Sequence, residues 1–406
     1  MFEQALLAMA SVATDPYLLF LIFATTILGV IIGVLPGLGA TTGAALLLPF
    51  TLTMDPVHAI AVLATIYVSA TFAGSITAIL INTPGTSAAA ATTFDGYPLA
   101  QKGEAGRALG VAVISSTVGG VFSVIVLCFA APLLARVAYE FRSPEYFALT
   151  VFGLSMLASI SAGGAVKNLI GGIFGVWLST IGAERVTGIE RFMFGNYELY
   201  EGLHFVPIFI GLFAISELLV QSKTVNKIVN TVSMKAVKLP TKEDYKKIWK
   251  TILRSCGIGT FIGVLPAEGA TVASMIGYSE ARRWSKNKEE FGKGSIEGIA
   301  GAEAANNSAT GGAMVPTMVL GIPGSGTTAI ILVGLMVHGL RPGVYLFTEQ
   351  VEKVYQIFGS MFFANIMFML MGLYAARLFA RVSLVPTAIL WPIVFGLSVI
   401  GAYAFQ

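Results

Sequence analysis

Apolar residues occur along this chain in runs of about 20, which is the length that spans roughly 30 Å of hydrocarbon. We expect membrane crossings near residues 57–81, 108–135, 145–162, 165–182, 202–221, 354–376 and 384–403. The stretches 17–53, 248–278 and 298–337 are also apolar but are interrupted. These runs lack the period-two alternation of a membrane β-barrel. The pattern predicts an all-α polytopic membrane protein.

The same motif interrupts two of the apolar stretches. Gly33-Val34-Leu35-Pro36 returns 230 residues later as Gly263-Val264-Leu265-Pro266. Proline removes a backbone donor and glycine loosens the backbone, so neither stretch can form one uninterrupted helix. Each arm beside a break is short for a full crossing. We therefore interpret 17–53 and 248–278 as re-entrant helical hairpins with tips near 36–41 and 266–271.

Two further landmarks recur in the same order. Thr83-Pro84-Gly85-Thr86 corresponds to Ile322-Pro323-Gly324-Ser325 at an offset of 239, and the sequence Val-Phe-Gly-Leu-Ser at 151–155 returns at 394–398. A duplication explains three matches in register. Each repeat should then hold one hairpin and one broken transmembrane helix, with breaks near 82–87 and 321–328. Five expected crossings separate the hairpins, and because five is odd, the two repeats should have inverted topology.

Charge placement predicts the orientation and the domain limits. Eight lysines in the loop 222–250 outnumber Glu243 and Asp244, and short lysine-rich loops face the cytoplasm. The N-terminus should then lie outside, and residues 1–15 contain no lysine or arginine. We expect a first transmembrane repeat at 1–182, a linker helix with the basic loop at 183–247, and a second, inverted repeat at 248–406 that is short at its C-terminal end.

Composition argues against several other protein classes. The chain is 55% hydrophobic and 12% charged, about half the charge of a soluble domain, and a net charge of +3 gives no reason to expect nucleic acid. Two cysteines and three widely separated histidines suggest neither a disulfide framework nor a metal site. Phosphate-loop, serine-hydrolase and zincin motifs are absent from the sequence. We expect no enzyme activity, no resident metal and no cofactor.

The breaks are where a substrate could bind. Half-helix N-termini present free N–H groups to an anion, and unwound carbonyls and hydroxyls suit Na⁺. The alternative is that these small residues only allow close helix packing. The motifs contain no lysine or arginine, so N–H groups, hydroxyls and amides would hold the anion. The predicted substrate-binding residues are Gly37, Gly39, Thr41, Thr42, Asn82, Thr83, Pro84, Gly85, Thr86, Ser87, Gly269, Thr271, Pro323, Gly324, Ser325, Gly326 and Thr327.

Acidic residues inside apolar segments are candidates for coupling to a cation. Glu268 lies at the second hairpin tip, and Glu303 lies near the start of a crossing. Either residue could carry a proton or coordinate a cation, although Glu303 could also be an interfacial residue at the cytoplasmic edge. Asn306 and Asn307 share that stretch and could line the same cavity. We expect Asp95 to lie in a loop.

The motifs together resemble the large membrane subunit of the tripartite tricarboxylate transporters. The resemblance covers nearly the whole chain and rests on residues 33–42, 82–85, 94–100, 263–271, 303–308 and 321–325. It implies a carrier in the bacterial inner membrane that works with a small membrane subunit and a periplasmic solute-binding protein. It also implies uptake of citrate-like carboxylates with Na⁺ or H⁺ as the coupling ion. A channel or pore-forming scaffold without gradient coupling is the alternative function.

Overall fold

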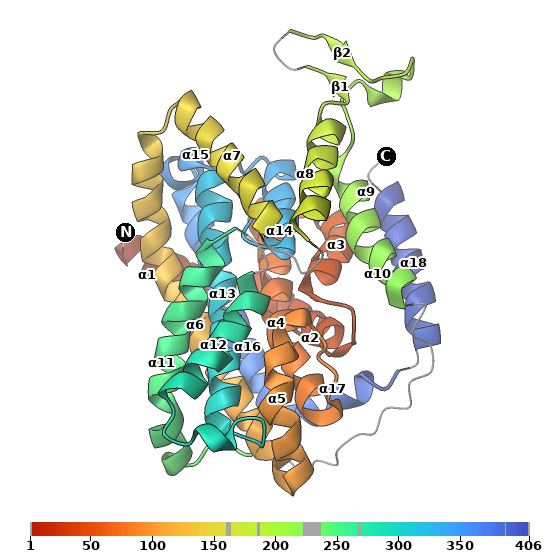
Figure 1. The fold of residues 1–406 in the computed structure, drawn as a ribbon. Coiled ribbons are helices and arrows are strands. Elements are labelled where there is room, and N and C mark those ends of the chain that lie inside the picture. Colours follow the sequence, from red (N-terminus) through yellow and green to blue (C-terminus); the bar gives the residue numbers. More distant parts are fainter. Residues whose placement is uncertain are drawn as a thin grey trace.

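The computed structural model describes residues 2–159, 164–184, 187–221, 237–266, 269–385 and 387–404, and most of them are helical (Figure 1). Within these residues, four helical stretches are long and apolar enough to cross a membrane. They are Pro16–Val34, Pro56–Ile81, Ser87–Tyr139 and Val351–Tyr374. The prediction of an all-α membrane protein is confirmed.

The first half of the chain is mostly helical, and a 3₁₀ turn and a π-turn precede its longest helix. Its elements are α1 (Phe2–Thr14), α2 (Pro16–Val34), α3 (Ala40–Thr51), α4 (Pro56–Ile81), the 3₁₀ turn η1 (Ser87–Ala89), α5 (Ala90–Leu99), the π-turn η2 (Ala100–Glu104), α6 (Ala105–Tyr139), α7 (Ser143–Ser159) and α8 (Ala165–Ser179). A small hairpin of β1 (Gly182–Ala183) and β2 (Glu190–Arg191) projects from one end of the molecule (Figure 1). The hydrophobic pattern did not predict these strands.

The remaining elements follow the hairpin. They are η3 (Tyr197–Leu199), α9 (Phe205–Phe209), η4 (Ile210–Ile215), α10 (Ser216–Gln221), α11 (Lys242–Val264), α12 (Gly269–Trp284), η6 (Lys288–Glu290), α13 (Ile296–Leu320), α14 (Gly326–Val337), α15 (Val344–Thr348), α16 (Val351–Tyr374), α17 (Ala376–Val382) and α18 (Thr387–Tyr403). Residues 222–236, the first part of the basic loop predicted at 222–250, lie outside the described residues. The predicted breaks near 36–41, 82–87 and 321–328 all fall where one helix ends and the next begins.

Local chemistry explains where these helices begin. Asp15 accepts the N–H groups of Tyr17 and Leu18 at the start of α2, where Pro16 occupies the first turn. Thr241 and Asp244 form a reciprocal capping box that starts α11. The first helix of the stretch predicted at 248–278 therefore begins at Lys242, six residues before residue 248. Its first turn is determined by the capping box rather than by hydrophobicity.

Two buried helices, α4 and α13, lie at the centre of the bundle (Figure 1). Helix α2 packs so closely on α4 that a Cβ atom at Gly29 would collide with Ser69. Helix α11 packs on α13 in the same way, because a Cβ atom at Gly259 would collide with Ser308. These glycines are 230 residues apart and their partners 239 apart, so the recurring landmarks share their packing as well as their sequence.

The central helices also end alike. Asn82 caps α4 with a left-handed φ of 53°, and its N–H donates to the Thr77 carbonyl. Gly321 caps α13 with a φ of 68°, and its N–H donates to the Pro316 carbonyl. The left-handed conformation turns the chain sharply away from each helix axis, which produces a break rather than a bend.

The prediction that Asp95 lies in a loop is wrong. Asp95 is on α5, is 0% exposed, and accepts the N–H groups of Gly294 and Ser295, both at 2.8 Å. Ser295 is the N-cap of α13. A carboxylate at this helix N-terminus compensates the positive end of the helix dipole. Asp95 therefore links α5 to the start of α13 through these two hydrogen bonds.

An ion pair fastens α6 to α11 at the same end of the molecule. Arg107 donates through Nε and Nη2 to the two carboxylate oxygens of Asp244, which is 4% exposed. Burial alone would raise the pKa of Asp244, but the hydrogen bonds from Arg107 and Thr241 lower the pKa below its ordinary value. The carboxylate therefore remains ionised and paired near neutral pH.

We predict that Asp244→Asn lowers the free energy of unfolding by about 1–2 kcal/mol at pH 7, since it weakens a partly exposed ion pair and a cap. A carboxyl group with a depressed pKa stabilises the fold above its unfolded pKa of about 3.9 and loses that effect as pH falls through the folded pKa. The difference between variant and wild type should therefore shrink below about pH 4. Thermal unfolding in detergent measures this difference, and the exposed neighbour Glu243→Gln is the control.

We also predict that Gly263→Val destabilises the protein by about 1–3 kcal/mol, because its side chain would fall on the Ala309 carbonyl. Gly257→Val on the same helix is the matched control, since nothing lies within 4 Å of the added Cβ atom. Thermal unfolding of both variants should separate them. Equal stability of the two would contradict the close packing of α11 on α13.

Candidate functional site

A cavity of about 110 Å³ lies where four helices begin. Its walls come from both halves of the chain, and many are residues that the sequence predicted. They are Gly39, Ala40, Thr41, Tyr67, Thr71, Thr86, Ser87, Ala88, Ala270, Thr271, Ser325, Gly326 and Thr327. The fold has thus brought residues from the predicted tips near 36–41 and 266–271 and from the breaks near 82–87 and 321–328 to one place.

Almost every wall of this cavity is the first turn of a helix. Gly39 is the N-cap of α3, Thr86 precedes η1 and α5, Gly269 begins α12, and Ser325 is the N-cap of α14. First-turn N–H groups have no acceptor within their own helix, and each helix start carries roughly half a positive charge. The cavity is therefore suited to an anion although no lysine or arginine lines it.

Two hydrogen bonds connect the halves across the cavity. The hydroxyls of Thr41 and Thr327 are 2.9 Å apart, and those of Ser87 and Thr271 are 3.0 Å apart. Each bond joins a hairpin tip of one half to the broken helix of the other half. A hydroxyl can donate or accept, so each of these groups can turn toward an incoming ligand.

Helix α4 supplies two cavity residues that the sequence reasoning missed. The Tyr67 hydroxyl accepts a hydrogen bond from Ser325 at 3.4 Å, and the Thr71 hydroxyl donates to the Tyr67 carbonyl at 2.7 Å. Both side chains are buried. Their spacing of four residues places them on one helix face, and polar groups four apart in an apolar crossing were the signal that could have found them.

Nine predicted residues lie beside the cavity rather than in its walls. They are Gly37, Thr42, Asn82, Thr83, Pro84, Gly85, Gly269, Pro323 and Gly324. Gly85 and Gly324 shape the breaks, because a Cβ atom at Gly85 would collide with the Gly33 carbonyl and one at Gly324 would lie 3.0 Å from the Gly263 carbonyl. The Gly85 N–H donates to the Gly74 carbonyl at 3.2 Å. Gly85 and Gly324 thus allow the close approach of the chain at the two breaks.

Of the four residues predicted to couple transport to a cation, three lie on α13. Glu303 is fully buried in α13 rather than at an edge, and it accepts hydrogen bonds from Thr92 and Ser116. Asn306 donates from Nδ2 to the Thr71 carbonyl at 3.4 Å, directly behind the cavity. Asn307 is fully buried. Glu268 lies outside the described residues.

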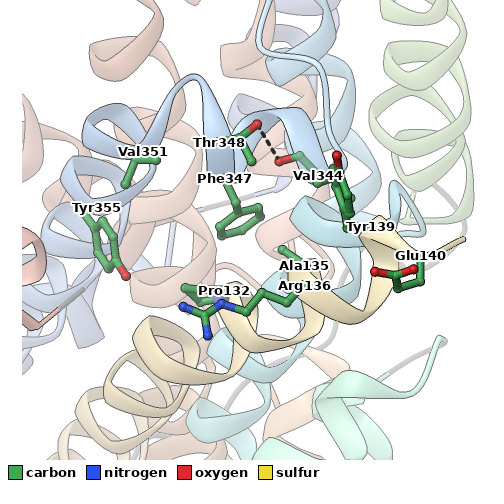
Figure 2. Close-up of a pocket in the computed structure, with 10 residues that line it drawn as sticks. All are labelled: Pro132, Ala135, Arg136, Tyr139, Glu140, Val344, Phe347, Thr348, Val351 and Tyr355. Atoms are coloured by element: carbon green, nitrogen blue, oxygen red, sulfur yellow. Dashed lines mark hydrogen bonds between the residues drawn. The ribbon is translucent and has the colours of Figure 1, made fainter.

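A larger pocket of about 440 Å³ lies between α6 and the α15–α16 region (Figure 2). Its lining residues are Pro132, Ala135, Arg136, Tyr139, Glu140, Val344, Phe347, Thr348, Val351 and Tyr355. Figure 2 shows the Arg136 guanidinium beside Pro132 and away from the Glu140 carboxylate. Arg136 could attract an anion, but this pocket contains no residue from a helix break. We therefore take the smaller cavity as the candidate site.

Comparisons with known proteins identify the family of this chain. Residues 19–406 match the profile of a family described as the tripartite tricarboxylate transporter TctA family. An Agrobacterium vitis protein, described as an uncharacterized 52.8 kDa protein in the TAR-I ttuC′ 3′ region, is 39% identical over 386 residues, covering 95% of this chain and 76% of that protein. An uncharacterized protein in the TAR-II ttuC′ 3′ region of the same organism is 35% identical over 148 residues, covering 36% of this chain and 61% of that protein. No solved structure matches the chain.

We predict that Thr41→Cys and Thr327→Cys together form a disulfide under mild oxidation, because their hydroxyls are 2.9 Å apart. Mass spectrometry of peptides from the oxidised protein detects the bridge. A Thr83→Cys, Thr327→Cys pair is the control, since Thr83 lies outside the cavity walls. Failure of the first pair to bridge, with an intact fold, would contradict the convergence of the two halves.

Proposed function

We propose, because this chain belongs to the tripartite tricarboxylate transporter TctA family, that it is the membrane subunit of a secondary active transporter. The proposed activity is uptake of tricarboxylates or related carboxylate anions by cation symport. The chain would work in a bacterial inner membrane with a small membrane subunit. A periplasmic solute-binding protein would deliver the substrate to it.

The proposed architecture consists of two inverted repeats, at 1–182 and 248–406. Helices α2 and α3 would form the first re-entrant hairpin, and α11 and α12 the second. The breaks after α4 and α13 would belong to the broken transmembrane helices. The shared caps at Asn82 and Gly321 support this arrangement. The N-terminus would lie outside the cell, and the basic loop would lie in the cytoplasm.

The observation that carries this function is the convergence of helix N-termini on one cavity. A carboxylate accepts hydrogen bonds from N–H and hydroxyl groups, and both kinds of donor surround the cavity at Thr41, Ser87, Thr271 and Thr327. Helix ends bind an anion without placing a full positive charge in the membrane. The site can therefore release its anion after transport, whereas a buried arginine would remain as an unpaired charge.

The size of the cavity implies a movement during transport. At about 110 Å³ it has room for one carboxylate group but is smaller than the roughly 300–1,000 Å³ of typical ligand pockets. A whole tricarboxylate requires the hairpin tips to move away from the breaks. The Thr41–Thr327 and Ser87–Thr271 hydrogen bonds would open in this step, and the substrate would take their place.

Uptake by the complete transporter in proteoliposomes tests this proposal. The assay would present a panel of di- and tricarboxylates under imposed Na⁺ or pH gradients. We expect accumulation against the substrate gradient and its loss when an ionophore removes the cation gradient. Flux that only runs downhill and ignores the cation gradients would instead support a channel or pore-forming scaffold.

Substitutions in the walls of the candidate cavity and of the larger pocket test where the substrate binds. We predict that Thr327→Val raises the KM for uptake about fivefold or more, because one hydrogen bond to the substrate is lost. Arg136→Gln should leave the KM within about twofold, since a solvated surface charge contributes little. Thr83→Val is the matched control for loss of a hydroxyl outside the cavity. A large effect of Arg136→Gln with none of Thr327→Val would move the substrate to the pocket of Figure 2.

A further inference from the structure

The carboxylate of Glu303 lies inside the protein without a positive partner. Thr92 of α5 donates to Oε1, and Ser116 of α6 donates to Oε2 at 2.6 Å. All three side chains are 0% exposed. No salt bridge involves Glu303 within the described residues. An ionised carboxylate without a partner costs several kcal/mol in such surroundings, so a bound cation or a proton must neutralise it.

Several ionisable groups on the neighbouring helices have other partners. Asp95 accepts the N–H groups that precede α13, and Glu297 of α13 accepts from Ser285 at 2.6 Å. The further pairs are Arg107 with Asp244 and Glu104, Tyr67 with Ser325, His58 with Asp15, Arg254 with the Trp284 ring, and Glu280 with Arg283. Cys128, Cys256, Tyr97 and Tyr278, which lie on these neighbouring helices, carry no positive charge that could neutralise Glu303.

We propose that Glu303 binds the ion that couples transport, and that this ion is a proton rather than Na⁺. This inference rests on the proposed transport function. A neutral carboxyl O–H can donate to the Thr92 or Ser116 hydroxyl, because a hydroxyl accepts as well as donates. The proton therefore fits without displacing any neighbouring atom.

Sodium fits this position less well. A hard cation such as Na⁺ needs several oxygen ligands around it. Here the two hydroxyls contact the carboxylate directly, one at each of its oxygens. Binding of Na⁺ would require α5 or α6 to move away from α13. Protonation requires only a change in which atom donates.

Polar groups without a partner adjoin Glu303 along the chain and along its helix. Ser115 precedes Ser116, and Asn307 lies one turn beyond Glu303. Within the part of the chain that the structure describes, the Ser115 hydroxyl and both amide atoms of Asn307 are buried and lack a protein partner. Buried polar groups of this kind are usually satisfied by ordered water. Water bound there gives a proton access to the Glu303 carboxylate.

The contacts of Glu303 also connect it to the substrate cavity. One turn along α13, Asn306 donates to the carbonyl of Thr71, whose side chain lines the cavity. Thr92 lies on α5, which continues from the Ser87 wall of the cavity. Loss of the proton would place a full charge between α13, α5 and α6, drawing in water and loosening their packing. The loaded carrier would change conformation only with Glu303 neutral, which couples the proton to the substrate.

Glu303→Gln in the complete transporter tests the proposal, because glutamine resembles the neutral carboxyl group. We expect accumulation driven by a pH gradient to fall about tenfold or more, while exchange of labelled substrate without a gradient stays within about threefold. Glu297→Gln, on the same helix, is the matched control and should retain both activities. Ser116→Ala should move the half-maximal uptake to higher pH, because it removes a donor that favours the charged form.

Infrared difference spectroscopy provides a measurement that does not depend on transport. The wild type should show a protonated-carboxyl band near neutral pH that is lost in Glu303→Gln and kept in Glu297→Gln. Absence of this band, pH-driven accumulation by Glu303→Gln, or wild-type uptake that responds to Na⁺ alone would each overturn the proposal. If the wild type takes up no carboxylate under any gradient, the proposed function fails, and the infrared band still decides whether Glu303 carries a proton.

Discussion

The fold depends on bringing polar backbone ends together inside an apolar bundle. A helix that stops within a membrane leaves N–H groups without acceptors, and each such group costs several kcal/mol unless something satisfies it. Here four helix starts meet at one cavity, where hydroxyls and small residues surround the exposed backbone. Hydrogen bonds between Thr41 and Thr327 and between Ser87 and Thr271 close the cavity. The same groups that make the breaks tolerable also form the proposed anion site.

Close helix packing is the condition for this arrangement. The central helices α4 and α13 accept α2 and α11 at distances that only glycine permits, at Gly29, Gly33, Gly259 and Gly263. Dispersion contacts and the absence of side chains stabilise such pairs, since lipid supplies no hydrophobic force between helices. Small residues in the breaks therefore have two functions. They let the helices approach, and they form the helix starts that line the cavity.

The proposed anion site and the proposed proton site depend on different electrostatic effects. The cavity attracts negative charge through helix dipoles, which are fixed. Glu303 changes its charge by binding one proton, and its partners Thr92 and Ser116 belong to helices that packing holds against α13. A fixed attraction for the substrate and a carboxylate of variable charge, one helix turn from Asn306, are the two parts that the proposed symporter needs. Asn306 and Thr71 connect them through one hydrogen bond.

The sequence by itself determined the membrane class, the positions of the breaks and their recurrence, because hydropathy, proline and glycine act locally. It also predicted Gly39, Thr41, Ser87, Thr271, Ser325 and Thr327 as substrate-binding residues, and the structure places these six in the walls of one cavity. Only the tertiary structure decided that Tyr67 and Thr71 face the same cavity and that Asp95 caps α13 rather than lying in a loop. It also decided that Glu303 is enclosed by Thr92 and Ser116. Those contacts join residues up to 258 positions apart, so they depend on how helices pack and not on any local pattern.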